Sequence, residues 1–396
     1  MSEVNIPLIS ASLVPTGVEV VWQDGRKTTF HTIWLRHSPG FPDSERPAGP
    51  NGRFPSGTSD TSPTDSRVTS DGQLKLDWTG GQQSLHDAIW LRQHIYDDEA
   101  LQQRRRPVVP WTAESLSKQV EFDYTELSLD EKSRLPLFEH MLDHGVVLLR
   151  NVPTQPNTLT TVANWLGHVP ANLYADDESQ PTISNVRFDP NVSIGTSMCH
   201  FLGPHTDTCW RQTLTGLLLL HCLKAHSNGG QSIVVDGFAV AERMREKHYE
   251  QFKLLCDLPL SFGSKVGEYD DWRVQGRVIS VAADGVLEGI RFNGNSFEQL
   301  ELPAELIEPT YQALETFESI LFDRALWWQP LLQPGDLLLV DNHRVLHGRE
   351  AFDPAGGERH LQSCSVDRDD FHARYRRLAK QLNNPGWDYR LTAGAN

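Results

Sequence analysis

Residues 203–220 read GPHTDTCWRQTLTGLLLL, which places two polar side chains just ahead of an apolar run. His205 and Asp207 are two residues apart, so on an extended segment their side chains point to the same side. The apolar run Leu217–Leu220 follows. An imidazole and a carboxylate therefore converge on one point, where they can hold a metal ion, exchange a proton or contact only water.

The sequence around this pair predicts a mainly β fold with inserted helices. Three short apolar segments predict strands, at Val146–Arg150, Val234–Asp236 and Leu337–Val340. Three segments with helical spacing predict helices, at Asp130–His144, Ala239–Cys256 and Pro309–Phe322. No internal repeat is visible. Strands with helices inserted in this way fit a double-stranded β-helix (jelly roll) better than a regular βαβ succession.

Two domains are expected, a small β-rich N-terminal domain over residues 1–106 and the jelly-roll domain over residues 107–396. Val18–Trp22 and Thr28–Trp34 surround Asp24-Gly25 in a strand–turn–strand pattern. Leu74–Trp78 predicts another strand. Residues 38–66 are rich in Pro, Gly, Ser and Asp, which predicts a long irregular loop.

Composition excludes several classes of partner. The formal net charge of −16 over 396 residues argues against nonspecific binding to nucleic acid or to an anionic membrane. The N-terminal residues do not resemble a signal peptide, and no apolar run is long enough to span a membrane. Five cysteines without CxxC spacing indicate reduced thiols in a cytoplasmic enzyme. The expected partners are a small-molecule substrate and a second copy of the chain in a homodimer.

A second motif supplies more ligand candidates. PGDLLLVDNHRVLHGRE (334–350) places His343 and His347 after an apolar strand, and GGERHL (356–361) follows with Arg359. Two imidazoles and one carboxylate on adjacent strands suit non-haem Fe(II), because they leave three coordination positions open. A 2-oxo acid can take two of these positions and dioxygen the third. An arginine can pair with the far carboxylate of that acid.

These motifs resemble those of the γ-butyrobetaine hydroxylase family of Fe(II)/2-oxoglutarate dioxygenases. The resemblance rests on HTDTCWRQTLTGLLLLHCLKAHSNGGQSIVVDGF (205–238) and on the L-H-G-R and R-H-L motifs. It implies that His205, Asp207 and His347 bind Fe(II), and that Arg359 grips 2-oxoglutarate. Leu220 is expected in the same co-substrate site. His343 is the rival for the second imidazole.

The chain departs from the family at two places. The family's accessory domain often carries a zinc site with clustered cysteines, but no cysteine precedes Cys199 here, so structural zinc is not expected. His37 and His86 are interpreted as ordinary polar residues. The second departure concerns the aromatic cage that encloses trimethylammonium substrates. Tyr174 and Phe188 occupy cage positions, whereas Thr208 and Ser365 stand where aromatic residues are common.

The resemblance implies oxidation, most simply hydroxylation, of an unactivated C–H bond in a small quaternary ammonium or amino-acid-like substrate, with release of succinate and CO2. Tyr174, Asn185, Phe188 and Asn293 are the expected substrate contacts. Two alternatives stay open, a metal-dependent hydrolase or isomerase without a redox step and a catalytically silent binding protein on the same fold. The first has no need for Arg359, and the second has no need for three metal ligands.

Overall fold

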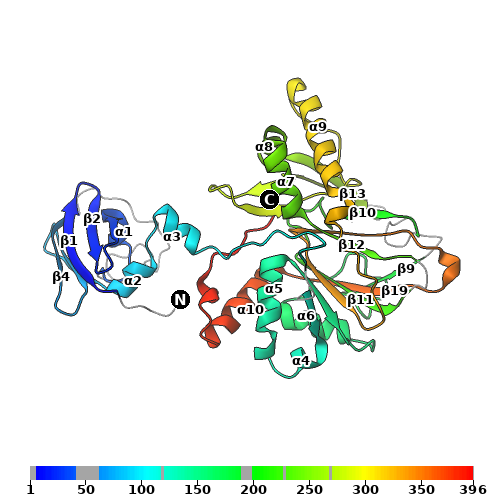
Figure 1. Ribbon diagram of the computed structural model, residues 1–396, viewed down its shortest axis with the longest axis horizontal. Helices are drawn as coiled ribbons and strands as arrows, with labels where there is room; N and C mark the ends of the chain where they lie inside the picture. The colour runs from blue at the N-terminus through cyan, green and yellow to red at the C-terminus, as the bar shows by residue number, and fades with distance from the viewer. Residues whose placement is uncertain are drawn as a thin grey trace. The chain divides into compact units, whose positions relative to one another are not determined.

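The computed structural model describes residues 6–41, 62–116, 120–188, 199–225, 229–266 and 270–395 (Figure 1). The chain divides into two compact units, Met1–Arg105 and Arg106–Asn396.

In its described residues, the first unit contains two three-stranded antiparallel sheets and three short helices. The first sheet comprises β1 (Leu8–Val14), β2 (Gly17–Trp22) and β3 (Lys27–His31), and the second comprises β4 (Pro63–Val68), β5 (Leu74–Trp78) and β6 (Gln83–His86). The helices are α1 (Thr32–Arg36), α2 (Ala88–Gln93) and α3 (Asp98–Gln103). Both sheets contribute to one core, in which Trp22, Phe30 and Trp78 are buried.

Two sequence predictions for this unit were wrong in part. The strand predicted over Thr28–Trp34 stops at His31, because the next five residues form α1. The loop predicted over residues 38–66 ends before Pro63, which begins β4. β4 is an edge strand, where a proline in first position removes no required hydrogen bond. Residues 42–61 of that predicted loop lie outside the described residues.

The second unit is built on two sheets. The six-stranded sheet has the order β7 (Glu121–Asp123), β8 (Val146–Arg150), β17 (Leu337–Asp341), β11 (Leu217–Lys224), β19 (His360–Val366), β9 (Ser184–Arg187). The three-stranded sheet has the order β10 (Leu202–His205), β18 (Val345–Arg349), β12 (Ser232–Asp236). All neighbours are antiparallel except β7 and β8. Strands far apart in the sequence therefore meet in both sheets.

One hydrophobic core takes residues from both sheets, so the sheets face each other. It includes Leu218 of the larger sheet and Val234 and Val345 of the smaller sheet, and we call it the inner core. Neighbouring side chains of a strand point to opposite faces. Leu217 and Leu219 therefore lie on the other face of β11, in a second core. The central strand β11 is thus covered on both faces.

Helices cover the outer faces of both sheets (Figure 1). Those that pack against the six-stranded sheet are α4 (Tyr124–Ser128), α5 (Leu135–His144), α6 (Thr158–Leu166) and α10 (Arg368–Gln381). Those beside the three-stranded sheet are α7 (Gly237–Lys247), α8 (Tyr249–Asp257) and α9 (Ala304–Leu321). Two hairpins join this second group, β13 (Leu260–Val266) with β14 (Asp270–Gly276), and β15 (Ile279–Val281) with β16 (Leu287–Ile290).

The predicted helices differ from the observed ones at their ends. Gly145 ends α5 in a left-handed conformation (φ 73°), as its position after His144 predicts. The helix predicted over Ala239–Cys256 is two helices, because the backbone of His248 (φ −142°, ψ 53°) leaves the helical region between α7 and α8. The helix predicted from Pro309 begins at Ala304, with the proline inside its second turn.

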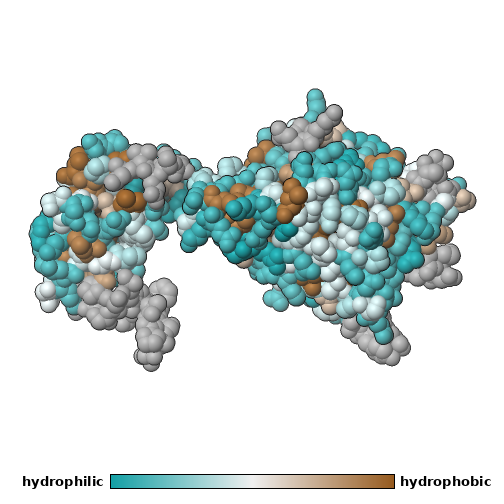
Figure 2. Space-filling view, turned by 90° about the horizontal axis from the view of Figure 1, so that it is seen from below, coloured by the Kyte–Doolittle hydropathy of each residue, from teal (hydrophilic) through white to brown (hydrophobic). Residues whose placement is uncertain are grey.

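The face shown in Figure 2 is mixed in character. Hydrophilic residues cover most of it, and hydrophobic residues form small separate groups. Within the described residues, no helix has both the length and the apolar character that a membrane crossing requires.

Candidate metal and co-substrate site

Two histidines from adjacent strands face each other in the smaller sheet. His205 ends β10 and is the cross-strand partner of His347 in β18. Their ring centroids lie 4.6 Å apart, and both side chains are buried. Because side chains alternate along β18, His347 lies on the same face as Val345, which belongs to the inner core. The fold therefore brings together two imidazoles that are far apart in the sequence.

Asp207 completes a cluster of three ligand groups. Its Oδ1 lies 3.3 Å from His205 Nε2 and 3.7 Å from His347 Nε2. The ligand atoms of the three residues all lie within 4.8 Å of one another, and this is the one such group among the described residues. Two imidazoles and a carboxylate form a donor set that suits a divalent transition metal.

The electrostatics of the cluster keep Asp207 and His347 in the protonation states that bind a metal. Burial lowers the pKa of His347 to about 4. Burial would raise the pKa of the Asp207 carboxyl, but the imidazoles of His347 and His205 outweigh it and hold this pKa at about 2. At neutral pH Asp207 is therefore ionised and His347 is neutral. Both are the protonation states in which these groups bind a metal.

The ring of His205 is held by a backbone contact. Its Nδ1–H donates to the carbonyl of Gly203 at 2.9 Å, which leaves Nε2 to face Asp207. This bond fixes the ring orientation, as partners behind metal-binding histidines commonly do. Burial lowers the pKa of His205, but the hydrogen bond and charge of Asp207 outweigh burial, so its pKa lies above the ordinary value of 6.5.

His343, the rival for the second imidazole, lies outside the cluster. It is buried, and its Nδ1 accepts a hydrogen bond from the backbone N–H of Ala395 at 3.0 Å. Its neighbour Asn342, which the sequence analysis did not select, instead contacts the backbone of Asp207. Its position inside the second motif, directly after the apolar strand, is the one signal in the sequence that can draw attention to Asn342.

Arg359 lies at the start of β19, beside the inner core. It lines a small cavity together with Cys222, Leu332 and Leu361, and no carboxylate of the described residues pairs with it. Burial and the nearby Arg349 guanidinium lower the pKa of Arg359 to about 10. An added Cβ at Gly230 would stand 3.3 Å from its Nε, so the backbone there approaches the guanidinium closely. Arg359 is therefore a buried cation without a nearby anion in the described residues.

Leu220 lies in β11, opposite Ser363 of β19, and packs against the inner core. The structure thus places it on the same face of the sheet as Leu361, two residues after Arg359.

The four expected substrate contacts divide into two groups. Tyr174 is 39% exposed, and its pKa is raised by burial and by the Asp207 carboxylate, which therefore lies close to its hydroxyl. Asn293 follows Phe292, whose carbonyl accepts the Thr206 N–H at 2.8 Å. The Oδ1 of Asn293 accepts a hydrogen bond from the backbone N–H of Asn295 at 3.0 Å, which is a contact within a turn. Both residues are thus close to the segment that carries the cluster.

Asn185 and Phe188 belong to β9 and the residue after it. Val186 packs on the inner core, so alternation directs Asn185 to the other face. There its Oδ1 contacts His360 Nε2 at 2.8 Å, and its Nδ2 donates to Asp176 at 2.9 Å. The structure does not bring Asn185 to the cluster. Phe188 follows the last residue of β9 and is 37% exposed.

Comparison with known proteins identifies the family. The model described as "Taurine catabolism dioxygenase TauD, TfdA family" matches residues 104–365. Gamma-butyrobetaine dioxygenase from Pseudomonas sp. (strain AK-1) is 32% identical over 375 residues, which cover 93% of this chain and 95% of that protein. Mitochondrial trimethyllysine dioxygenase from Bos taurus is 29% identical over 306 residues, covering 75% of this chain and 70% of that protein.

A solved structure shows the same fold. It is described as a "Putative Alpha-ketoglutarate-dependent Taurine Dioxygenase from Burkholderia xenovorans", and it matches with a TM-score of 0.51 and 10% identity over 66% of this chain and 91% of that one. The family match and the 32% identity confirm the resemblance inferred from the motifs. The chain therefore belongs to the TauD/TfdA family, and it is a 2-oxoglutarate-dependent dioxygenase of the γ-butyrobetaine dioxygenase-like group.

Proposed function

We propose that the chain hydroxylates an unactivated C–H bond of a small quaternary ammonium or amino-acid-like substrate, with release of succinate and CO2. The observation that carries the proposal is the convergence of His205, Asp207 and His347, whose ligand atoms lie within 4.8 Å of one another. This cluster occurs in a chain whose family consists of dioxygenases.

The cluster fits Fe(II). Two imidazoles and an ionised carboxylate would hold the metal from one side and leave positions for a co-substrate and dioxygen. Bound Fe(II) supplies the activation of dioxygen, which the side chains themselves cannot provide. The protein's part is to keep Asp207 ionised, to keep His347 neutral and to fix the ring of His205 through Gly203.

Arg359 is proposed to bind the far carboxylate of 2-oxoglutarate. Its support is a buried guanidinium that no carboxylate of the described residues neutralises, since burying an isolated charge is unfavourable without a partner. A planar guanidinium can donate two parallel hydrogen bonds to a carboxylate. Leu220, on the same face of the sheet as Leu361, is proposed to contact the carbon chain of the co-substrate.

In the proposed reaction, 2-oxoglutarate loses CO2 and becomes succinate, which takes one oxygen atom of dioxygen. The second oxygen atom enters the substrate C–H bond as a hydroxyl group. Arg359 and the three-residue cluster orient the co-substrate from its two ends. The apolar side chains of the inner core exclude water, which protects the reacting groups from side reactions.

The substrate proposal rests on Tyr174 and Phe188. Two relatives are named for γ-butyrobetaine and trimethyllysine, and we extend that substrate class to this chain as a proposal. The Asp207 carboxylate helps to raise the pKa of Tyr174, which puts the Tyr174 hydroxyl within electrostatic reach of the cluster. Thr208 and Ser365 supply no aromatic face, so the cage would be incomplete. Asn293 is retained as a polar contact, and Asn185 is not.

We also propose that residues 107–396 form a jelly roll and that residues 1–106 form an accessory domain without structural zinc. In support, the buried His86 uses both ring nitrogens within the domain. Its Nε2 contacts Ser84 Oγ at 2.8 Å, and its Nδ1 contacts Ser38 Oγ at 3.1 Å and the carbonyl of Pro39 at 3.0 Å. The five free thiols suit a reducing compartment such as the cytoplasm.

The test is substrate-dependent formation of succinate. The purified protein would be supplied with Fe(II) and 2-oxoglutarate and offered betaines, trimethylated amino acids and free amino acids, with mass spectrometry of the products. A product heavier by one oxygen atom, formed in step with succinate, supports the proposal. Substrate conversion without succinate would indicate the hydrolase or isomerase. Substrate binding without conversion, in protein loaded with Fe(II), would indicate a silent binding protein.

A further inference from the structure

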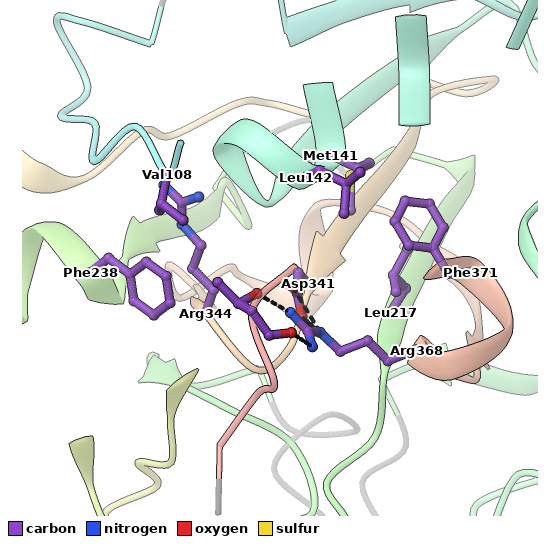
Figure 3. Close-up of a pocket in the computed structure, with 10 residues that line it drawn as sticks. Val108, Met141, Leu142, Leu217, Phe238, Asp341, Arg344, Arg368 and Phe371 are labelled. Carbon is purple, nitrogen blue, oxygen red and sulfur yellow. Dashed lines mark hydrogen bonds and ion pairs between the residues drawn. The ribbon is translucent and has the colours of Figure 1, made fainter. Parts of the chain in front are cut away.

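A four-residue turn, Asp341–Arg344, joins β17 to the strand that carries His347. Each side chain of the turn has a separate anchor. Asp341 pairs with Arg368 at 3.2 Å, as Figure 3 shows, and Arg344 pairs with Asp236 at 2.8 Å. The third anchor is the contact of His343 with the backbone of Ala395. These contacts fix the turn firmly in the second unit.

The fourth side chain, Asn342, is fully buried and binds the segment that carries Asp207. Its Oδ1 accepts the backbone N–H of Asp207 at 2.7 Å. Its Nδ2 donates to the carbonyl of Asp207 at 3.1 Å and to the carbonyl of Thr215 at 3.0 Å. Its own backbone N–H donates to Gly216 at 3.0 Å. One amide thus grips the main chain of Asp207 on both sides of its Cα.

The segment after Asp207 needs such support. Thr208 has φ 55°, a left-handed conformation that is unfavourable for a β-branched residue and persists only where surrounding contacts impose it. The hydroxyl of Thr208 accepts the backbone N–H of Thr215 at 2.8 Å. Together with Asn342, this contact closes the loop from Asp207 to Thr215.

We propose that Asn342 is a positioning residue for the metal centre, which sets the direction of the Asp207 carboxylate relative to His347. The argument is geometric. Asn342 belongs to the turn that leads into β18, and it binds both backbone groups of Asp207, so a displacement of one ligand segment moves the other. This inference rests on the proposed metal site. A residue with a purely structural role would affect stability but not the affinity of the folded protein for a metal.

The experiment measures the affinity of the folded, metal-free protein for Mn²⁺ alone, in the parent, in Asn342→Ala and in a control, Asn384→Ala. Asn384 also donates and accepts hydrogen bonds through its amide, with Glu139 and Gly386, away from the cluster. Asn342→Ala is expected to weaken Mn²⁺ binding about 10- to 100-fold, the usual effect of removing a group behind a metal ligand. Asn384→Ala is expected to change it less than about two-fold.

Thermal unfolding of each variant shows whether it is folded at the assay temperature. If Asn342→Ala does not fold, the pair Thr208→Val and Thr208→Ser replaces it, because serine keeps the hydroxyl that holds the loop and valine removes it. Weaker Mn²⁺ binding by the valine variant alone supports the proposal. Parent-like Mn²⁺ affinity in folded Asn342→Ala, or in Thr208→Val when that pair is used, overturns the role of Asn342. Absence of Mn²⁺ binding in the parent overturns the proposed metal site itself.

Discussion

Replacing Arg359 with methionine should stabilise the metal-free protein while it weakens the binding of 2-oxoglutarate. The opposite signs follow from one feature, the buried guanidinium that no carboxylate of the described residues neutralises. Methionine fills a similar elongated volume without charge. The substitution therefore distinguishes two roles of Arg359. If the cation serves ligand binding, its removal stabilises the metal-free protein; if it serves folding, its removal destabilises the protein.

The stability change can be worked from the pKa. Burial and Arg349 lower the pKa of Arg359 from its ordinary 12.5 to about 10, which corresponds to about 3 kcal/mol of unfavourable free energy for the charged group in the folded state. Loss of the cation–π contact with Phe352, 5.8 Å from the guanidinium carbon, removes about 1 kcal/mol of stabilisation. A net gain of about 1–3 kcal/mol is expected. The unfavourable free energy of the buried Arg359 charge is constant between roughly pH 6 and pH 9, because Arg359 is protonated in both the folded and the unfolded state below pH 10.

The binding change follows from the proposed charge-assisted pair of Arg359 with 2-oxoglutarate. Removal of one partner of such a buried pair costs about 2–5 kcal/mol. The affinity of the Mn²⁺-loaded protein for 2-oxoglutarate should then fall by about 30-fold or more. The affinity for Mn²⁺ alone should stay close to that of the parent, because Arg359 is not one of the three clustered ligand groups.

Arg368→Met is the matched control. Arg368 is 9% exposed, as Arg359 is, but it pairs with the carboxylate of Asp341 and with Thr392. Its loss leaves a buried carboxylate unpaired and should destabilise the protein by about 3–5 kcal/mol. Chemical unfolding of the metal-free proteins measures both variants. A destabilised Arg359→Met with unchanged 2-oxoglutarate affinity would refute the reasoning.

Three further predictions concern the cluster, the cage and the N-terminal domain. His205→Ala, Asp207→Ala and His347→Ala should each abolish succinate formation and leave the circular dichroism spectrum nearly unchanged; parent-like activity in any one removes that residue from the centre. Phe188→Leu should weaken a trimethylammonium substrate several-fold and its tert-butyl analogue hardly at all, since a cation–π contact contributes about 0.5–2 kcal/mol; a parent enzyme without preference for the cation contradicts the cage. Metal analysis after removal of iron should find no stoichiometric zinc, and one retained zinc per chain would contradict that expectation.

The convergence of the three residues could be predicted from the sequence because their two motifs resemble those of the γ-butyrobetaine hydroxylase family, whereas spacing alone left His343 as a rival. His343 and His347 were harder to separate, since both follow the same apolar strand at Leu337–Val340. In the structure, His347 lies in β18, whereas His343 lies in the turn that precedes this strand. His347 faces His205 across two strands, and His343 bonds to the backbone of Ala395.

Long-range pairing explains what the sequence did not predict. Asn185 looked like a substrate contact until the register of β9 with β19 placed it opposite Gln362, on the outer face. Asn342 carries no motif of its own, because its partners are backbone atoms of residues more than 100 positions away. Local backbone conformation also changed a predicted helix. The dihedral angles of His248 divide the helix predicted over Ala239–Cys256 into α7 and α8.

The placement of β11 has a consequence for how the chain is made. Both of its neighbours, β17 and β19, come from the last part of the sequence, and the farthest ends at Val366. At a synthesis rate of about 5–20 residues per second, the apolar strand Leu217–Lys224 emerges roughly seven to thirty seconds before it can be paired on both edges. During that interval its leucines have neither a strand on each edge nor a completed core on each face. We therefore expect the exposed strand to favour aggregation of the nascent chain, and a protein truncated before β17 should accumulate as insoluble material.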